Sequence, residues 1–439
     1  MKIKTLFLVA AAASFTMTSC KKEDDNNETP SAQTQKFKVT IENIQTPYSY
    51  MSSGIFNTPV GASMPGGAGP GSAYEFTVHA DQDSKLSFAT MFVGSNDLFF
   101  GPEEGGLPLY NNGTLVTGDV TAQIKLWDAG TEVNEMPGAG ANQPMNQSGP
   151  NTGPAENGTV RDIANVMDGF TYPSVSSTIR VTLTAGTNPN EVVVRIDNLA
   201  GSTTPIAPGV WAVHKSGYPI FRDGMADLGN GLEALAEDGS PVALGAYLEM
   251  NSGINTPFAP GVWAVHSSST KPVFMAGDNS SAGLEALAED GNAAVLGTAS
   301  ETTTGVSSSG VFNTPMGAST PGPIFPGGKY EFTFTATKGE YLSIATMYVQ
   351  SNDLFYGFGQ NGYELWSGNS PQSGDISSVI QLWDAGTEVN ELPGFGMNQP
   401  PRQAAANTGA DENGTVMTVN DGYTYLMNDK SIRVTLSLN

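Results

Sequence analysis

The chain has 439 residues and a formal net charge of −24 at pH 7. This excess of acids argues against a nucleic-acid-binding protein, which needs a basic face to neutralise phosphates, and against electrostatic docking on anionic lipid. Only 14% of the residues are charged, while 52 are Gly and 28 are Pro, so the composition favours a loop-rich, mostly β protein over a helical bundle. Three His and one Cys exclude a Cys/His zinc site and a disulfide framework from the folded part.

Residues 1–20 have the pattern of an export signal. Lys2 and Lys4 precede an apolar segment, residues 6–17, that is too short to span a bilayer as a helix. The signal ends in Met-Thr-Ser-Cys, which resembles the lipobox of a bacterial lipoprotein and makes Cys20 the expected lipidation site. The alternative is an ordinary signal peptide with an incidental Cys. We therefore expect an exported protein that contacts the membrane only through its lipid anchor.

Residues 21–36 follow the expected anchor and are predominantly polar. Three consecutive acids, Glu23 to Asp25, resemble the acidic tether that directs some bacterial lipoproteins to the outer cell surface. Such a polar segment cannot bury enough apolar surface to fold, so we predict a disordered tether over residues 21–36. The expected location is the outer membrane, with the protein at the cell surface.

Two long segments, residues 53–160 and 309–416, are copies of one another. Identical motifs recur 256 residues apart, as at Asp97 and Asp353 or at Asp128 and Asp384. Several runs in and around the copies alternate apolar and polar residues, as half-buried antiparallel strands do. The runs predicted as strands include residues 37–44, 74–80, 85–93, 122–129 and 178–184.

A shorter repeat lies between the two copies. APGVWAVH ends at His214 and again at His266, and GLEALAEDG, the clearest helix candidate, recurs at the same 52-residue offset. Strands separated by long turns predict an all-β protein with antiparallel β-sandwich domains in tandem and short helices in an insertion of the second domain. The predicted boundaries are 37–186 for the first domain and 190–439 for the second, which carries both 52-residue modules at about 204–300.

These motifs resemble the spondin N-terminal domain family, the family of the F-spondin and mindin amino-terminal domains. The resemblance is carried twice by S-N-D-L-F-[FY]-G followed by W-D-A-G-T-E, and by APGVWAVH, GLEALAEDG and the closing R-V-T-L strand. It implies a C2-like β-sandwich with one calcium ion per domain. The metal ligands that it implies are Glu75, Asp97 and Asp128 in the first copy and Glu331, Asp353 and Asp384 in the second.

The residues themselves also favour a metal in each copy. Calcium prefers six to eight hard oxygen ligands, and carboxylates gathered without a cation repel one another unless some are protonated. Asn96 and Glu132, with Asn352 and Glu388 in the second copy, are candidates for further ligands or for groups that support the ligands. The alternative is that the aspartates are ordinary turn formers that bond their own backbone.

Other chemistries have weaker support in the sequence. Paired acids could serve glycoside hydrolysis, but a metal explains the same acids better, and we expect no enzyme activity. For His214 and His266 we favour packing or a hydrogen bond over a metal or catalytic role. Trp211 and Trp263 are expected in the core or at a sheet edge, with a sugar platform as the alternative.

The predicted function is adhesion or another extracellular interaction, with an unknown protein or glycan as partner and no nucleic acid. The Gly/Pro/Asn-rich loops 136–160 and 392–416 would offer binding surface. One alternative is a carbohydrate-binding accessory protein of a glycan-uptake system, which would use exposed aromatic side chains. Those candidates are Trp211, Trp263, Phe99, Phe100, Phe355 and Tyr356. A polysaccharide- or peptide-cleaving enzyme and a surface-layer component are further alternatives.

Overall fold

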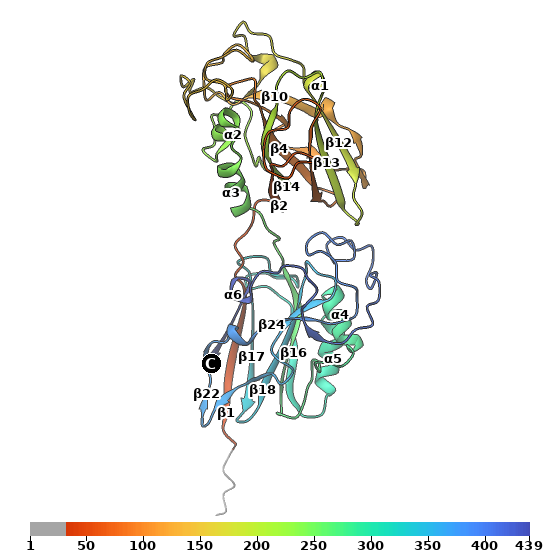
Figure 1. Ribbon diagram of the computed structural model, residues 1–439. Coiled ribbons are helices and arrows are strands. Elements are labelled where there is room, and N and C mark those ends of the chain that lie inside the picture. The colour runs from red at the N-terminus through yellow and green to blue at the C-terminus, as the bar shows by residue number, and fades with distance from the viewer. Residues whose placement is uncertain (1–31) are drawn as a thin grey trace, which may run out of the picture.

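Two antiparallel β-sandwiches with the same internal topology make up residues 32–439, which are the residues that the computed structural model describes (Figure 1). The all-β sandwich class expected from the sequence is confirmed. The export signal, Cys20 and most of the expected tether lie outside the described residues. Strand β1 begins at Thr34, so the last three residues of the expected tether belong to a strand. Among residues 32–439, no helix has the length and apolarity needed to cross a membrane.

The N-terminal sandwich, residues 50–250, pairs a smaller sheet with a larger one. The smaller sheet has the order β3 (Ala73–His79), β13 (Glu191–Asn198), β12 (Ile179–Ala185), β9 (Gly118–Asp119). The larger sheet has the order β11 (Arg161–Asp162), β10 (Ile124–Asp128), β5 (Leu98–Pro102), β4 (Lys85–Phe92), β14 (Ile206–His214), β2 (Ser52–Phe56), with β6 (Leu107–Pro108) also on β4. A small hairpin joins β7 (Tyr110–Asn111) to β8 (Thr114–Leu115).

The C-terminal sandwich, residues 34–43 together with 258–438, repeats this arrangement. Its smaller sheet has the order β17 (Lys329–Thr337), β1 (Thr34–Asn43), β26 (Ile432–Leu438), β23 (Gly374–Asp375). Its larger sheet has the order β25 (Met417–Thr418), β24 (Gln381–Asp384), β19 (Leu354–Gly357), β18 (Tyr341–Tyr348), β15 (Phe258–His266), β16 (Val306–Phe312), with β20 (Tyr363–Glu364) also on β18. A small hairpin joins β21 (Trp366–Ser367) to β22 (Ser370–Pro371).

The predicted domain boundaries, 37–186 and 190–439, are wrong. Strand β1 belongs to the C-terminal sandwich, where it lies between β17 and β26, and β13 takes the equivalent place in the N-terminal sandwich. Each sandwich therefore receives one APGVWAVH strand, β14 or β15, instead of both falling in the second domain. The N-terminal sandwich is inserted between β1 and β15 of the C-terminal one, and its strand order along the chain is a circular permutation of its host's.

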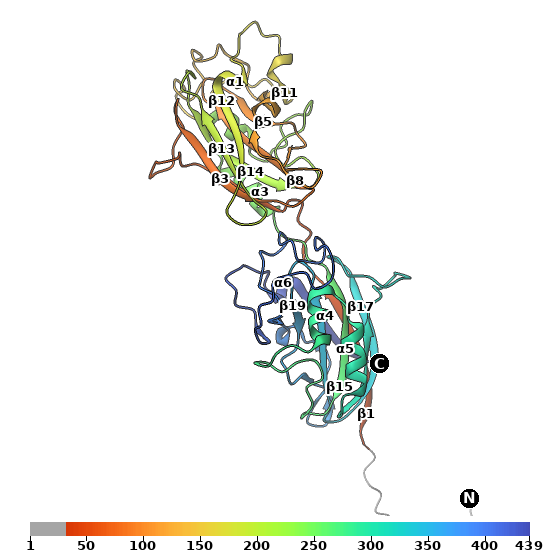
Figure 2. The same ribbon diagram turned by 90° about the vertical axis from the view of Figure 1, so that its right-hand side faces the viewer.

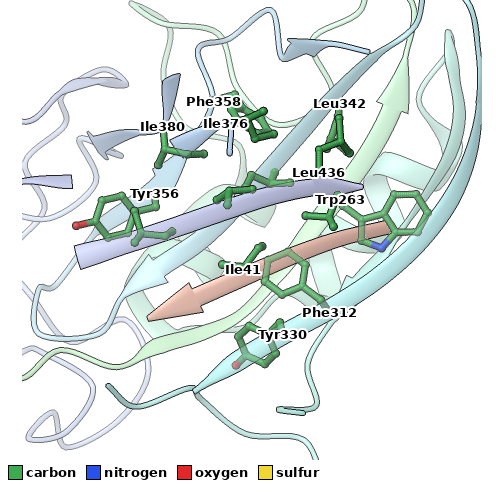
Figure 3. Packing of buried hydrophobic residues seen from close by; sticks show 14 of the residues in the cluster. Ile41, Trp263, Phe312, Tyr330, Leu342, Tyr356, Phe358, Ile376, Ile380 and Leu436 are labelled. Carbon is green, nitrogen blue, oxygen red and sulfur yellow. The ribbon is translucent and has the colours of Figure 1, made fainter. Parts of the chain in front are cut away.

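The core of the C-terminal sandwich shows why β1 belongs there. Phe37, Val39 and Ile41 alternate along the strand and are fully buried, as half-buried β periodicity requires. Figure 3 shows Ile41 among side chains that come from the far end of the chain, including Tyr330 and Leu436. In the N-terminal sandwich β13 buries Val192, Val194 and Ile196 in the same alternation.

Two chain segments run side by side from one sandwich to the other (Figure 1, Figure 2). The sandwiches lie end to end in both views. Tyr50 and Ser252 form a parallel bridge. The Asn255 side chain makes two hydrogen bonds to Tyr48 in the other segment. Its Oδ1 accepts from the Tyr48 N–H at 2.8 Å, and its Nδ2 donates to the Tyr48 carbonyl at 2.9 Å. This double connection is a direct consequence of the insertion.

A pair of helices flanks each sandwich. Short helices were expected in the segment of about 204–300 and are found there, but the first pair belongs to the N-terminal sandwich. The pairs are α2 (Leu232–Asp238) with α3 (Val242–Met250), and α4 (Ala282–Asp290) with α5 (Ala294–Thr302). The first helix of each pair is the predicted GLEALAEDG helix, and it ends at a glycine in the left-handed conformation, Gly239 or Gly291. The remaining helices are single turns: α1 (Val175–Thr178), α6 (Asn428–Ser431) and 3-10 turns at Thr121–Gln123, Ile163–Asn165 and Ser377–Val379.

Candidate metal centre

Each sandwich holds a cluster of three carboxylates at the β5/β10 or β19/β24 end of its larger sheet. The N-terminal cluster consists of Asp97, Asp128 and Glu156, and the C-terminal cluster consists of Asp353, Asp384 and Glu412. In each, one oxygen from every residue lies within 4.8 Å of the other two. Two oxygens on opposite sides of a calcium ion, each about 2.4 Å from it, are about 4.8 Å apart, so both clusters have the span of a divalent-cation site.

The local fold brings together three segments that are far apart in the sequence. In the N-terminal cluster Asp97 lies in the turn between β4 and β5, Asp128 ends β10, and Glu156 lies in the long loop before β11. Gly130, two residues after the end of β10, has φ +68°, and a Cβ on it would lie 2.6 Å from the Thr159 carbonyl oxygen. Only glycine allows this close approach of the loop to the end of β10.

The first aspartate of each cluster is fully buried, and only one of its two carboxylate oxygens accepts hydrogen bonds. Oδ2 of Asp97 accepts the N–H groups of Thr131 at 3.1 Å and Glu132 at 3.2 Å, and Oδ2 of Asp353 accepts those of Thr387 and Glu388. Oδ1 of both aspartates is buried and has no hydrogen-bond partner among the described residues. A buried carboxylate oxygen without a donor is unfavourable, and a cation would satisfy it.

Burial also shifts the acidity of these groups. Removal from water, with Asp128 close by, raises the pKa of Asp97 well above its usual value. The same two causes, burial and the neighbouring Asp384, raise the pKa of Asp353 to about 8. Burial also raises the pKa of Asp384 and of Glu412. Without a cation, Asp353 therefore tends to keep its proton at neutral pH, and a bound cation would displace that proton.

The second aspartate of each cluster bonds its own loop. Oδ1 of Asp128 accepts the Gly130 N–H at 2.7 Å, and its Oδ2 accepts the Asn134 amide at 2.8 Å. Asp384 makes the equivalent bonds to Gly386 and Asn390. These are the turn interactions that formed the alternative to metal binding, so each aspartate is both a turn residue and a member of a carboxylate cluster.

The expected glutamate ligands, Glu75 and Glu331, are not at the clusters. They lie on β3 and β17, in the smaller sheet of each sandwich, where Glu75 pairs with Arg195 and Glu331 pairs with Lys38, both at 3.1 Å. Glu156 and Glu412 take the third place instead. Both begin the repeated E-N-G-T-V motif, which was a sequence signal for them, but a loop of more than twenty residues separates that motif from the aspartates.

The candidates for further ligands form hydrogen bonds with backbone groups of the loops around the clusters. Asn96 donates to the Val133 carbonyl at 2.9 Å, and Oε1 of Glu132 accepts the Gly153 N–H at 2.7 Å. Asn352 and Glu388 make the equivalent bonds at 2.7 and 2.8 Å. None of the four belongs to a three-carboxylate cluster.

The long loops expected to offer binding surface are partly tied to the helices. Gln147 and Asn151 of the first loop bond Asp238 and Glu233 of α2 at 2.8 and 3.0 Å. Gln403 and Asn407 of the second loop bond Asp290 and Glu285 of α4 in the same way. Each helix therefore holds the loop that carries the third carboxylate of its own cluster.

A further buried glutamate on each of these helices was not singled out by the sequence. Glu237 on α2 and Glu289 on α4 are 2% and 3% exposed, and Oε2 of each has no hydrogen-bond partner among the described residues. Burial is the main cause that raises the pKa of each to about 7. They lie beside the loops of the clusters, since the charges of Glu132 and Glu388 contribute to the two shifts.

The two strand-end histidines are structural, as predicted. His214 is fully buried and lies 2.9 Å from the Ser87 hydroxyl through Nε2 and 3.1 Å from the Ser216 carbonyl through Nδ1. His266 has the same arrangement with Ser343 and Ser267. Burial lowers the pKa of both imidazoles, which favours their neutral form.

The aromatic residues proposed for sugar stacking are mostly unavailable. Four are fully buried in the cores: Phe99, Phe100, Phe355 and Tyr356. Trp263 is 9% exposed and stacks on Phe332 at 5.4 Å, and the partly buried Trp211 stacks on Phe76 at 5.8 Å. The expectation of core or sheet-edge positions for the tryptophans is confirmed, and the glycan-binding alternative loses the platform on which it rested.

Comparison of the chain with protein-family profiles found no matching family, and comparison with curated proteins found no relative. The class of protein is therefore defined by its architecture: a pair of β-sandwiches, one inserted into the other, each with a buried acidic cluster that could hold a metal ion.

Proposed function

We propose that this chain is a lipid-anchored bacterial cell-surface protein with two spondin-like β-sandwiches, that it binds calcium through a buried acidic cluster, and that it acts in adhesion or another extracellular interaction. The observation that carries the metal part is the buried, unpartnered Oδ1 of Asp97 and of Asp353, because each of these side chains belongs to a cluster with two further carboxylates. All candidate ligands are hard oxygen atoms, which suit calcium better than a softer transition metal.

Calcium has a structural role in this proposal. An ion between Asp353, Asp384 and Glu412 would join the β18–β19 turn, the end of β24 and the following loop, and would reinforce the hydrogen bonds that Asp353 accepts from Thr387 and Glu388. A ligand that binds only the folded state stabilises it by about 2.7 kcal/mol at a hundred times its Kd. For a sandwich of this size, that corresponds to a rise in Tm of roughly 5–10 °C.

Thermal unfolding of the purified chain in calcium and in chelator tests the metal. We expect a reversible rise in Tm with calcium, and the Asp353→Asn/Asp384→Asn double variant should lose it for the C-terminal sandwich. Glu331→Gln is the matched control, because this acid pairs with Lys38 in the other sheet and should leave the response intact. An unchanged Tm in calcium and chelator would refute the metal.

The location and the interaction are tested on cells. Protease added to intact cells should digest the protein, and Cys20→Ser should release it from the membrane fraction. Adhesion of cells to immobilised extracellular proteins should require the chain and should fall in chelator. Equal adhesion of cells with and without the chain would refute the adhesive role, whatever the outcome for the metal.

A further inference from the structure

We propose that the two acidic clusters are not equivalent: the C-terminal cluster is the divalent-cation site, while in the N-terminal cluster the guanidinium of Arg161 takes the place of the cation. This inference rests on the proposed metal binding and assigns it to one of the two repeats. It depends on a position at which one repeat places a positive charge against the carboxylates and the other does not.

Position 161 of the first copy corresponds to position 417 of the second. Arg161 on β11 is the pairing partner of Asp128 on β10, and Met417 on β25 is the pairing partner of Asp384 on β24. The backbone register is therefore the same at both clusters. An arginine at one of these positions and a methionine at the other is a difference of one full positive charge beside three carboxylates.

Arg161 bridges two members of its cluster. Its Nη2 donates to Oδ2 of Asp128 at 2.9 Å and to Oε1 of Glu156 at 2.6 Å, and its Nε donates to Oδ2 of Asp128 at 3.1 Å. The Asp128 side chain is fully buried, so these charge-assisted bonds form in a region of low dielectric. A cation that bound at this cluster would have to displace the guanidinium or accept its repulsion.

The C-terminal cluster has no such counter-charge. Within residues 32–439, no Lys, Arg or His forms an ion pair with Asp353, Asp384 or Glu412. Oδ2 of Asp384 accepts only from the Asn390 amide. The methionine in place of the arginine is 48% exposed, so it neither fills the cluster nor neutralises it.

A second observation, which both clusters share, points to a ligand at the C-terminal cluster, where no guanidinium takes the place of the ligand. Asp353 is fully buried, and its Oδ1 has no donor, although Oδ2 of the same side chain accepts two backbone N–H groups. With no guanidinium near, Asp353, Asp384 and Glu412 each offer one oxygen to an ion, and these oxygens lie within 4.8 Å of one another. Water can complete the coordination on the exposed side of Glu412.

The test is a reciprocal exchange in the full chain, with calcium binding measured by titration calorimetry. We expect one site for the unaltered chain and two for Arg161→Met. For Met417→Arg, the affinity of the remaining site should fall at least about tenfold, because displacing charge-assisted hydrogen bonds has at least that effect. Arg180→Met is the matched control, since Arg180 is a strand arginine of the same sandwich that pairs with Asp197 away from the cluster.

Single neutralised aspartates provide a second measurement if an exchanged variant does not fold. Asp384→Asn should remove the calcium site, and Asp128→Asn should leave one site. Two sites of equal affinity in the unaltered chain would overturn the inference and leave the proposed metal binding standing. No calcium binding by the unaltered chain or by Arg161→Met would overturn both.

Discussion

Because one sandwich is inserted into the other, we predict that a substitution near the start of the chain destabilises the sandwich formed mainly by its end. Ile41 lies near the N-terminus, but its side chain is fully buried in the core of the C-terminal sandwich, where its neighbours in the sheet are Tyr330 and Val434 (Figure 3). Replacing a fully buried Ile by Ala removes favourable burial and leaves a cavity, at about 2–5 kcal/mol. Ile41→Ala should therefore destabilise the C-terminal sandwich and not the sandwich that follows it in the chain.

The magnitude can be expressed as a melting temperature. For a folded unit of 150–250 residues, 1 kcal/mol corresponds to roughly 2–4 °C in Tm, so Ile41→Ala should lower the C-terminal transition by roughly 4–20 °C. Ile196→Ala is the matched variant, because Ile196 takes the same place on β13 and is also fully buried. It should lower the N-terminal transition instead.

Differential scanning calorimetry combined with limited proteolysis can assign the two transitions. At a temperature between them, Ile41→Ala should leave a protected fragment close to residues 50–250, with cleavage in residues 258–438. For Ile196→Ala the protected and cleaved regions should be exchanged. Early cleavage within residues 50–185 in Ile41→Ala would refute the strand assignment and favour the sequential domain order.

Three further predictions follow from single contacts. Burial raises the pKa of Glu289 to about 7 in the folded protein, so the folded state binds this proton more tightly than the unfolded state does. The free energy of unfolding should therefore fall as the pH rises through 7. Glu289→Gln should abolish this fall, which amounts to up to about 3 kcal/mol, and Tm measured from pH 5 to 9 tests it. Glu412→Gln should weaken calcium binding in calorimetry and Glu331→Gln should not, and the reverse result would restore the strand glutamate as a ligand. Asn43→Ala removes the 2.9 Å hydrogen bond to the buried Thr256 carbonyl, which keeps the 3.2 Å bond from Gln45, so chemical denaturation should show a loss of about 0.5–1.5 kcal/mol, and a neutral result would contradict this contribution.

Prediction from the sequence succeeded where the signal was local. The alternating pattern located the main strands, and Leu232, Leu235 and Ala236 on one face identified the helix that α2 forms. Asp97 and Asp128 lie together because each ends or follows a buried strand, and neighbouring strand ends meet at one edge of a sheet. The third carboxylate, Glu156, was missed because its position depends on how a long loop returns to the sheet.

The repeats and the alternating patterns were enough to establish two copies of one all-β unit, to locate most strands, and to identify the two aspartates of each cluster. The assignment of each repeated segment to its sandwich required the three-dimensional fold. Strands β1 and β13 have the same alternation and fit the same gap between neighbouring strands, so their patterns cannot distinguish two equivalent positions. That choice depends on the path of the two segments between the sandwiches, and the pairing of Arg161 with Asp128 likewise depends on contacts between distant residues.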